Sequence, residues 1–142
     1  MPVTPVDLTH HPPATRLRLA VEIVIAYARV RSTMRTSEPA EAVTKLRAYA
    51  RRHPIEGDQD RELLAGWRLG RAVTRTLRLL PTDSRCLMQS LTLLTMMERR
   101  SLSPSLVIAV KQQPFAAHAW IELHGQALLP DGGPEYERIT EL

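Results

Sequence analysis

Three side chains that can carry out acyl transfer lie in the second half of the chain, at Cys86, His118 and Asp131. A cysteine thiolate attacks a carbonyl carbon, an imidazole takes up and returns the proton, and a carboxylate can fix the tautomer of that imidazole. Cys86 is the single cysteine of the chain, so no intrachain disulfide can form and the thiol is a candidate nucleophile. Packing is the alternative explanation, because free cysteines are among the most buried residues.

Cys86 stands at the start of a predicted helix. The segment "TDSRCLMQSLTLLTMMERR" places Asp83 or Ser84 at the N-cap, so that Cys86 falls in the first helical turn. Unpaired N–H groups and the positive end of the helix dipole stabilise a thiolate there, and the N–H of Cys86 itself can help to hold an oxyanion. The methionines of this segment are expected to fill the core. One apolar stripe of the helix is expected to face inward: Leu87, Leu91, Leu94 and Met97.

His118 lies in an alternating segment that is expected to pair with the residues after it. "AAHAWIEL" has the period of a half-buried strand, and a turn at His124-Gly125 leads into "QALLP", which suits a two-residue hairpin. In that register Asp131 stands opposite His118, and opposed residues have Cβ atoms about 4.5–5.5 Å apart on one face. We therefore expect Asp131 to accept the Nδ1 proton of His118 and to leave the other ring nitrogen for the Cys86 thiol. A slip of one residue would turn Asp131 to the opposite face.

Four helices and a few short strands must position these residues. Apolar residues recur at helical spacing in three segments before Cys86, namely 15–34, 38–53 and 60–80. In the first segment the residues expected to face inward are Leu17, Val21, Val24 and Ala28. A β-branched strand at Leu106–Val110 precedes the hairpin, and "YERI" follows as a last short strand. The predicted fold is an α+β domain in which a helical N-terminal part packs on a small antiparallel sheet.

A single domain is expected for a chain of 142 residues. Residues 1–13 hold four prolines and show no periodicity, which predicts a mobile N-terminal arm. The domain then covers residues 14–142, with a helical subregion at 14–80 and the catalytic helix plus sheet at 81–142.

The net charge of +4 is unevenly distributed. Residues 1–100 carry 17 Lys and Arg against 10 Asp and Glu, whereas residues 101–142 carry 2 against 5. A basic helical face can attract nucleic acid or an acidic peptide. A solvated face is the simpler explanation, so no nucleic-acid partner is expected.

Neither a membrane span, a secretion signal nor a metal site is expected. The most apolar segment, "LAVEIVIAYARV", is interrupted by Glu22 and Arg29 and is too short to cross a bilayer. The N-terminus lacks a basic segment followed by an apolar one. One cysteine and scattered histidines give no zinc-ligand spacing, so neither a metal nor a cofactor is predicted. A single cysteine is also typical of a reducing, cytoplasmic setting.

The segments "CLMQSLTLL", "LVIAV" and "PFAAHAWIEL", followed by a turn glycine, together resemble the transglutaminase-like cysteine proteases of lasso peptide biosynthesis. The resemblance extends over residues 84–131. It implies a papain-like protease core in which Cys86, His118 and Asp131 form the catalytic triad.

What the resemblance implies is cleavage of a ribosomally made precursor peptide between its leader and its core. An ATP-dependent partner cyclase then joins the freed core amine to an acidic side chain. The chain is similar to the split form of the family, which needs a separate small leader-binding protein. Two departures from the family pattern are Ala109, where glycine is often found, and Gln89, where a basic residue is common. Trp120 is expected either to line a substrate groove or to pack in the core.

Two other functions stay open on the sequence alone. A transglutaminase-like acyltransferase would form the same thioester on Cys86 but pass the acyl group to an amine. A basic adaptor or nucleic-acid-binding module would not use Cys86 at all. Alkylation of the thiol against pH separates these classes, because a thiolate paired with His118 reacts well below the pKa of ~8.5 of a free cysteine.

Overall fold

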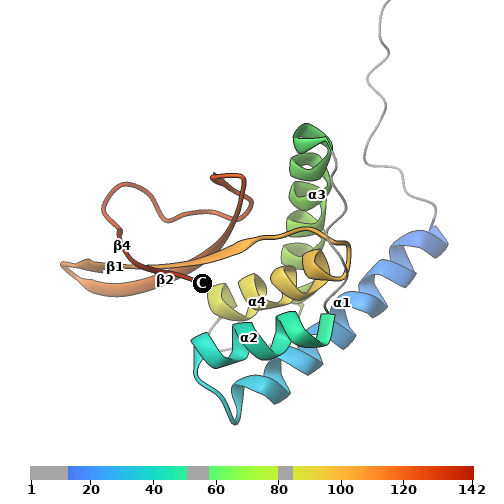
Figure 1. Cartoon of the computed structure of the whole chain (residues 1–142), viewed down its shortest axis with the longest axis horizontal. Helices are drawn as coiled ribbons and strands as arrows, with labels where there is room; N and C mark the ends of the chain where they lie inside the picture. Colours follow the sequence, from blue (N-terminus) through green and yellow to red (C-terminus); the bar gives the residue numbers. More distant parts are fainter. Residues whose placement is uncertain (1–12, 51–57, 80–84) are drawn as a thin grey trace, which may run out of the picture.

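The predicted α+β architecture is confirmed by the structure, a computed structural model that describes residues 13–50, 58–79 and 85–142. Within these residues, four helices gather at one end of a four-stranded sheet (Figure 1). The helices are α1 (Pro13–Met34), α2 (Pro39–Ala50), α3 (Gln59–Leu77) and α4 (Arg85–Glu98). The strands are β1 (Ser105–Gln112), β2 (Phe115–Leu123), β3 (Gln126–Ala127) and β4 (Glu137–Glu141). The predicted caps Asp83 and Ser84 and most of the predicted N-terminal arm lie outside the described residues.

The core is centred on α4. Every residue from Leu91 to Met97 is buried, because α1, α2 and α3 surround the helix together with β2. The single inward stripe predicted from the sequence is therefore too narrow: a helix that is apolar all round is covered all round. The two buried threonines of α4 satisfy their hydroxyls within the helix, since Thr92 donates to Met88 O at 2.7 Å and Thr95 donates to Leu91 O at 2.9 Å.

A different face of α1 packs on the core from the one that the sequence predicted. The buried residues are Ile23, Ala26, Tyr27 and Val30. The residues predicted to face inward, Leu17, Val21, Val24 and Ala28, are all exposed. Apolar residues occur on both sides of this helix, so that spacing could not select the buried face, and packing against α4 decided it. Among the described helices, including this one, none is long and apolar enough to cross a membrane.

The sheet has the strand order β3-β2-β1-β4, and its paired strands are antiparallel. The predicted hairpin turn is confirmed. His124 and Gly125 have positive φ angles of 51° and 76°, as a type I′ turn requires, and Leu123 pairs with Gln126. The returning strand ends at Ala127, however, and is therefore much shorter than the predicted "QALLP".

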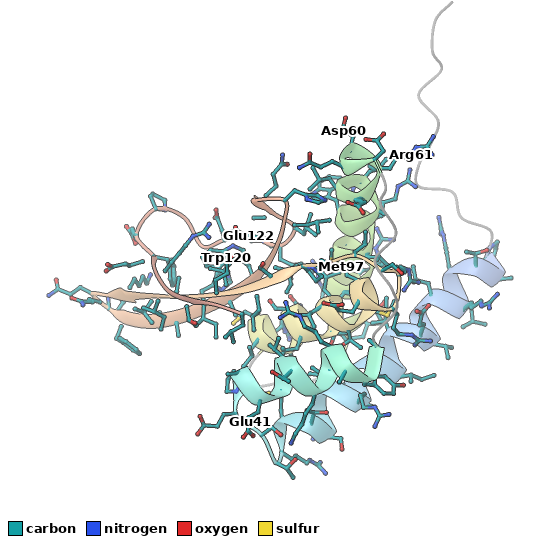
Figure 2. The ribbon with its side chains drawn as sticks, viewed as in Figure 1. Glu41, Asp60, Arg61, Met97, Trp120 and Glu122 are labelled. Carbon is teal, nitrogen blue, oxygen red and sulfur yellow. The ribbon has the colours of Figure 1, made fainter. Side chains whose placement is uncertain are left out.

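Different parts of the chain cover the two faces of β2. We call them the helix face (Ala119, Ile121 and Leu123) and the histidine face (His118, Trp120 and Glu122). The helix face is buried against α3 and α4. The C-terminal segment, residues 128–142, covers the histidine face through its loop at 130–136 and through the Arg138 side chain, whereas its strand β4 lies in the sheet beside β1. Figure 2 shows Trp120 and Glu122 between the strands and that segment.

Candidate active site

Cys86 is the second residue of α4, in the first turn of the helix as predicted. Its thiol is free and partly buried, and it packs against the apolar core. The N–H groups of a first helical turn have no acceptor inside the helix, and the helix dipole is positive at this end. Both features give this end of α4 a positive potential.

Ser90 fixes this end of α4 to β2. It lies one helical turn after Cys86, on the same side of the helix, and its hydroxyl donates to Ala119 O at 3.2 Å. Ala119 follows His118 in β2. A single hydrogen bond thus brings the start of the helix to the strand that carries the histidine.

The short β3 leaves room for this contact. Leu128 N–H donates to Ile121 O at 2.8 Å, so the odd-numbered carbonyls of β2 point toward the β3 side of the sheet. The strand β3 pairs with only two residues of β2. Beyond it, the Ala119 carbonyl accepts a hydroxyl of α4 in place of a strand. The start of α4 therefore lies at the open edge of β2, next to His118.

The C-terminal segment holds the imidazole of His118. His118 Nε2 lies 2.6 Å from Pro130 O. Because a carbonyl oxygen can only accept, Nε2 carries a proton, so that in the neutral imidazole Nδ1 is the nitrogen with the lone pair. The rings of Trp120 and Tyr136 flank the imidazole with centroids 5.8 and 5.6 Å away, and a Cβ built on Gly132 would lie 3.0 Å from His118 Cδ2. The ring is thus fixed with Nδ1 as the nitrogen that can take up a proton.

Asp131 lies next to this contact in sequence but has another partner. Its Oδ1 accepts the backbone N–H of Gly133 at 3.1 Å, which closes a turn in the loop that presents the Pro130 carbonyl. The hydrogen bond of His118 goes to that carbonyl and uses Nε2, whereas the sequence predicted the Asp131 carboxylate and Nδ1. Asp131 as the third member of a triad stays a prediction.

Within the described residues, no hydrogen bond joins the Cys86 thiol to His118. Cys86 of α4 packs against the apolar core, whereas His118 lies on the histidine face of β2. The arrangement therefore places the helix of the candidate nucleophile against the strand of the candidate base.

Trp120 does not line a groove. Its side chain is 4% exposed, and Nε1 donates to Glu122 Oε2 at 2.9 Å. Of the two expectations for this residue, the structure supports packing. Arg138 Nη2 donates to the same carboxylate oxygen at 2.6 Å, so that the buried Glu122 carboxylate accepts two hydrogen bonds.

The family comparison matches residues 15–142 to the Transglutaminase-like superfamily. The match covers most of the chain and includes the start of α4 and the whole sheet. The chain belongs to the transglutaminase-like superfamily. Domains of this superfamily are typically cysteine proteases or acyltransferases. No curated protein and no solved structure matches the chain.

Two residues of this transglutaminase-like site were missed by the sequence analysis, and both had a signal. Pro130 has no N–H to give to a strand ladder, which marks the end of pairing before Asp131. Ser90 stands among apolar residues of a buried helix, where a hydroxyl needs an acceptor. Only the tertiary structure shows that the acceptor is the carbonyl of Ala119.

A hollow of about 340 Å³ lies elsewhere, between α3 and the β2–β3 hairpin. Its lining residues are Leu63, Leu64, Trp67, Gln126, Ala127 and Leu128. The hollow contains neither Cys86 nor His118 and is therefore separate from the candidate active site. In the described parts of the chain, no group of three His, Cys, Asp or Glu side chains could hold a metal ion.

Proposed function

We propose that this domain is a cytoplasmic cysteine endopeptidase that removes the leader peptide from a ribosomally made lasso peptide precursor. The observation that carries the proposal is the Ser90–Ala119 hydrogen bond, which holds Cys86, in the first turn of a buried helix, beside the strand of His118. Membership of the transglutaminase-like superfamily supports the cysteine chemistry. The segments "CLMQSLTLL" and "PFAAHAWIEL" support the lasso peptide substrate by resemblance.

The reaction is an acyl transfer in two steps. His118 Nδ1 takes the thiol proton, and the Cys86 thiolate attacks the carbonyl carbon of the scissile peptide bond. The C–N bond breaks as His118 gives its proton to the leaving amine, and the leader stays on Cys86 as a thioester. Water, losing a proton to His118, then attacks the thioester carbon, and the C–S bond breaks to release the leader carboxylate and the thiol. The N–H of Cys86 can donate to the oxyanion in both steps.

Asp131 enters this proposal as the third member of the site. Through its bond to Gly133 N–H it shapes the loop whose Pro130 carbonyl holds His118. Its contribution is therefore expected to be smaller than that of His118, which moves protons in both steps.

Two partners complete the proposed function. A separate small leader-binding protein presents the precursor to the domain. An ATP-dependent cyclase consumes the product, because the cleavage frees the α-amine that must be joined to an acidic side chain of the core.

The test is to incubate the domain with the precursor and the leader-binding protein and to weigh the products. Two masses are expected, those of leader and core, and their sum exceeds the precursor by one water. In water enriched in ¹⁸O, one heavy oxygen should enter the new leader carboxylate. Incorporation of an added amine in its place would assign the domain to the acyltransferases instead.

Variants of the two catalytic residues are the controls. Cys86→Ala and His118→Ala should leave the precursor intact. Because Cys86 is the single cysteine, iodoacetamide blocks no other thiol and should also abolish cleavage. Continued cleavage by Cys86→Ala, or by the alkylated domain, would overturn the proposal.

A further inference from the structure

We propose that Glu122 is a positioning residue of this site and that it acts on His118 through the indole of Trp120. The inference rests on the proposed roles of Cys86 and His118. The sequence alone gives Glu122 no such role, because four residues of strand separate it from His118 by about 13 Å at ~3.3 Å per residue. The structure supplies the missing link in the residue between them.

The first step is the contact between imidazole and indole. Trp120 shares the histidine face with His118, and the two rings lie 5.8 Å apart with their planes inclined by 31°. Only one orientation of the indole directs Nε1 to the carboxylate of Glu122, at 2.9 Å. Because Trp120 is 4% exposed, it has no solvent to turn into. The orientation of the indole, and with it one wall of the imidazole site, is therefore set by Glu122.

The second step is the anchor of Glu122 itself. Its side chain is 8% exposed, and Arg138 Nη2 donates to Oε2 at 2.6 Å. Arg138 comes from β4, whereas Glu122 and Trp120 come from β2, so the pair joins strands at either side of β1. A buried carboxylate that loses its cationic partner is strongly unfavourable. The ion pair with Arg138 therefore holds the Glu122 carboxylate in the position from which it accepts the Trp120 N–H.

The third step is the row across the sheet that places Arg138 near the histidine. Ala109 of β1 pairs with His118 on one side and with Arg138 on the other. Directly paired residues share a face of the sheet. Ala109 is fully buried and has only a methyl group, so it leaves the space above it to its larger neighbours. The Arg138 guanidinium also lies over the Trp120 ring, 5.8 Å from its centroid.

Other charged and titratable groups face His118 from the surrounding elements. They are Glu122 of β2, Arg138 of β4, Tyr136 and Asp131 of the C-terminal segment, and Lys111 of β1. Lys111 reaches this side through the ring of Tyr136, with Nζ 5.4 Å from its centroid. Within this set, Glu122 alone is hydrogen-bonded to a ring that packs beside the imidazole, the indole of Trp120.

The experiment measures alkylation of Cys86 by iodoacetamide as a function of pH, for the whole chain without any precursor. Variants are Glu122→Gln, which removes the charge, Trp120→Phe, which removes the indole N–H, and the double variant. Each single change should raise the pH midpoint by about one unit, which lowers the rate about tenfold at pH values below both midpoints. The double variant should be no slower than the slower single variant, because both changes act on one hydrogen bond: Glu122→Gln replaces its charged acceptor by a weaker neutral one, and Trp120→Phe removes its donor.

Glu98→Gln is the matched control. Glu98 of α4 pairs with Arg47 at 3.1 Å, and its side chain is 15% exposed. The substitution removes the same charge from another partly buried ion pair that makes no contact with His118. Melting temperature should fall for both Gln variants, whereas the alkylation midpoint should move only for Glu122→Gln. Trp120→Phe remains the test if Glu122→Gln does not fold, because it removes the indole donor and leaves the Glu122–Arg138 ion pair in place.

The outcomes separate this inference from the proposed function. An unmodified chain whose thiol reacts as an ordinary free cysteine, near pH ~8.5, contradicts the Cys86–His118 pair and thus the function. A reactive thiol in the unmodified chain with an unchanged midpoint in Glu122→Gln and Trp120→Phe overturns the inference alone. Equal shifts in Glu122→Gln and Glu98→Gln, or additive shifts in the double variant, overturn it as well.

Discussion

Residues 119–123 of β2 are buried on both faces of the strand, but by different kinds of contact. On the helix face, Ala119, Ile121 and Leu123 are 5, 0 and 2% exposed and pack against apolar side chains. On the histidine face, Trp120 and Glu122 are 4 and 7% exposed, and named hydrogen bonds join this face to the C-terminal segment. Burial alone therefore does not tell the two faces apart.

The two kinds of contact differ in whether they fix the direction of a side chain. Apolar packing is non-directional and gives stability in proportion to the buried area. Hydrogen bonds fix the direction of a group, and a buried polar group without its partner is costly. One strand thus stabilises the fold with one set of side chains and orients an imidazole with the other.

The largest expected effect distinguishes the two faces by their roles, stability for the helix face and orientation of the imidazole for the histidine face. It is measured by comparing Ile121→Ala with His118→Ala. Ile121 is fully buried, and such truncations cost about 2–5 kcal/mol because a cavity remains. His118→Ala loses one hydrogen bond of a partly exposed side chain, worth about 1 kcal/mol. Urea denaturation should give the larger loss for Ile121→Ala, whereas alkylation at neutral pH should slow only in His118→Ala. The reverse order in either measurement would contradict the division of roles.

Gly132 offers a sharper test of the histidine face, with Gly133 as its control. Both have positive φ, 80° and 94°, where a side chain costs roughly 1–2 kcal/mol. A Cβ on Gly132 would also lie 2.8 Å from Tyr136 Cδ2 and 3.0 Å from His118 Cδ2, whereas one on Gly133 meets nothing within 4 Å.

Alanine at either glycine should therefore lower the free energy of unfolding by the cost of the positive φ, which is similar at the two positions. Only Gly132→Ala should also displace the imidazole and slow Cys86 alkylation, by about tenfold at pH values below the alkylation midpoint if that midpoint rises by one unit. Equal alkylation rates in Gly132→Ala and Gly133→Ala would show that this loop does not hold the ring.

The sequence predicted the helix-rich first half, the strand of His118 and the two-residue turn at His124-Gly125, because periodicity and turn chemistry are local. It also placed Cys86 in the first turn of α4. It did not predict which face of α1 is buried, since Val24 and Ile23 are equally apolar neighbours in the sequence. Nor did it predict the acceptor of His118. The predicted hairpin register is observed as far as Leu128, which pairs with Ile121. Pairing ends before Pro130, which has no N–H for a strand ladder, and the Pro130 carbonyl accepts from His118 instead.

Substitutions of Asp131 test the prediction that this residue is the third member of the triad. If the residue acts by its turn, Asp131→Asn should keep the acceptor for Gly133 N–H and most of the alkylation rate. Asp131→Ala loses that bond, worth about 0.5–1.5 kcal/mol, and should be the slower variant, though faster than His118→Ala. An Asn variant as slow as the Ala variant would mean that the charge of Asp131 acts on His118 directly. Alkylation rates and melting temperatures of the three variants decide between the two roles.

The smallest expected effect concerns an ion pair on the helical side, which contrasts with the buried pair of the histidine face. Arg100 binds both oxygens of Glu22, at 2.9 and 3.0 Å, and this hydrogen bonding lowers the pKa of Glu22 below its ordinary value of 4.5, with Arg99 and Arg18 adding attraction. A lowered pKa contributes stability that is present above pH 4.5 and is lost as the pH falls through the folded value.

Glu22→Gln should therefore lower the free energy of unfolding near pH 7 by only about 0.2–1 kcal/mol, because the pair is partly exposed and screened by solvent. Below pH 4 the difference from the unmodified chain should shrink, and the acid limb of stability should become flatter. Urea denaturation at pH 7 and pH 3.5 measures both. A difference that grows toward low pH would contradict the assigned sign, whereas the expected convergence would show that the helical side depends little on directed polar contacts, unlike the face that carries His118.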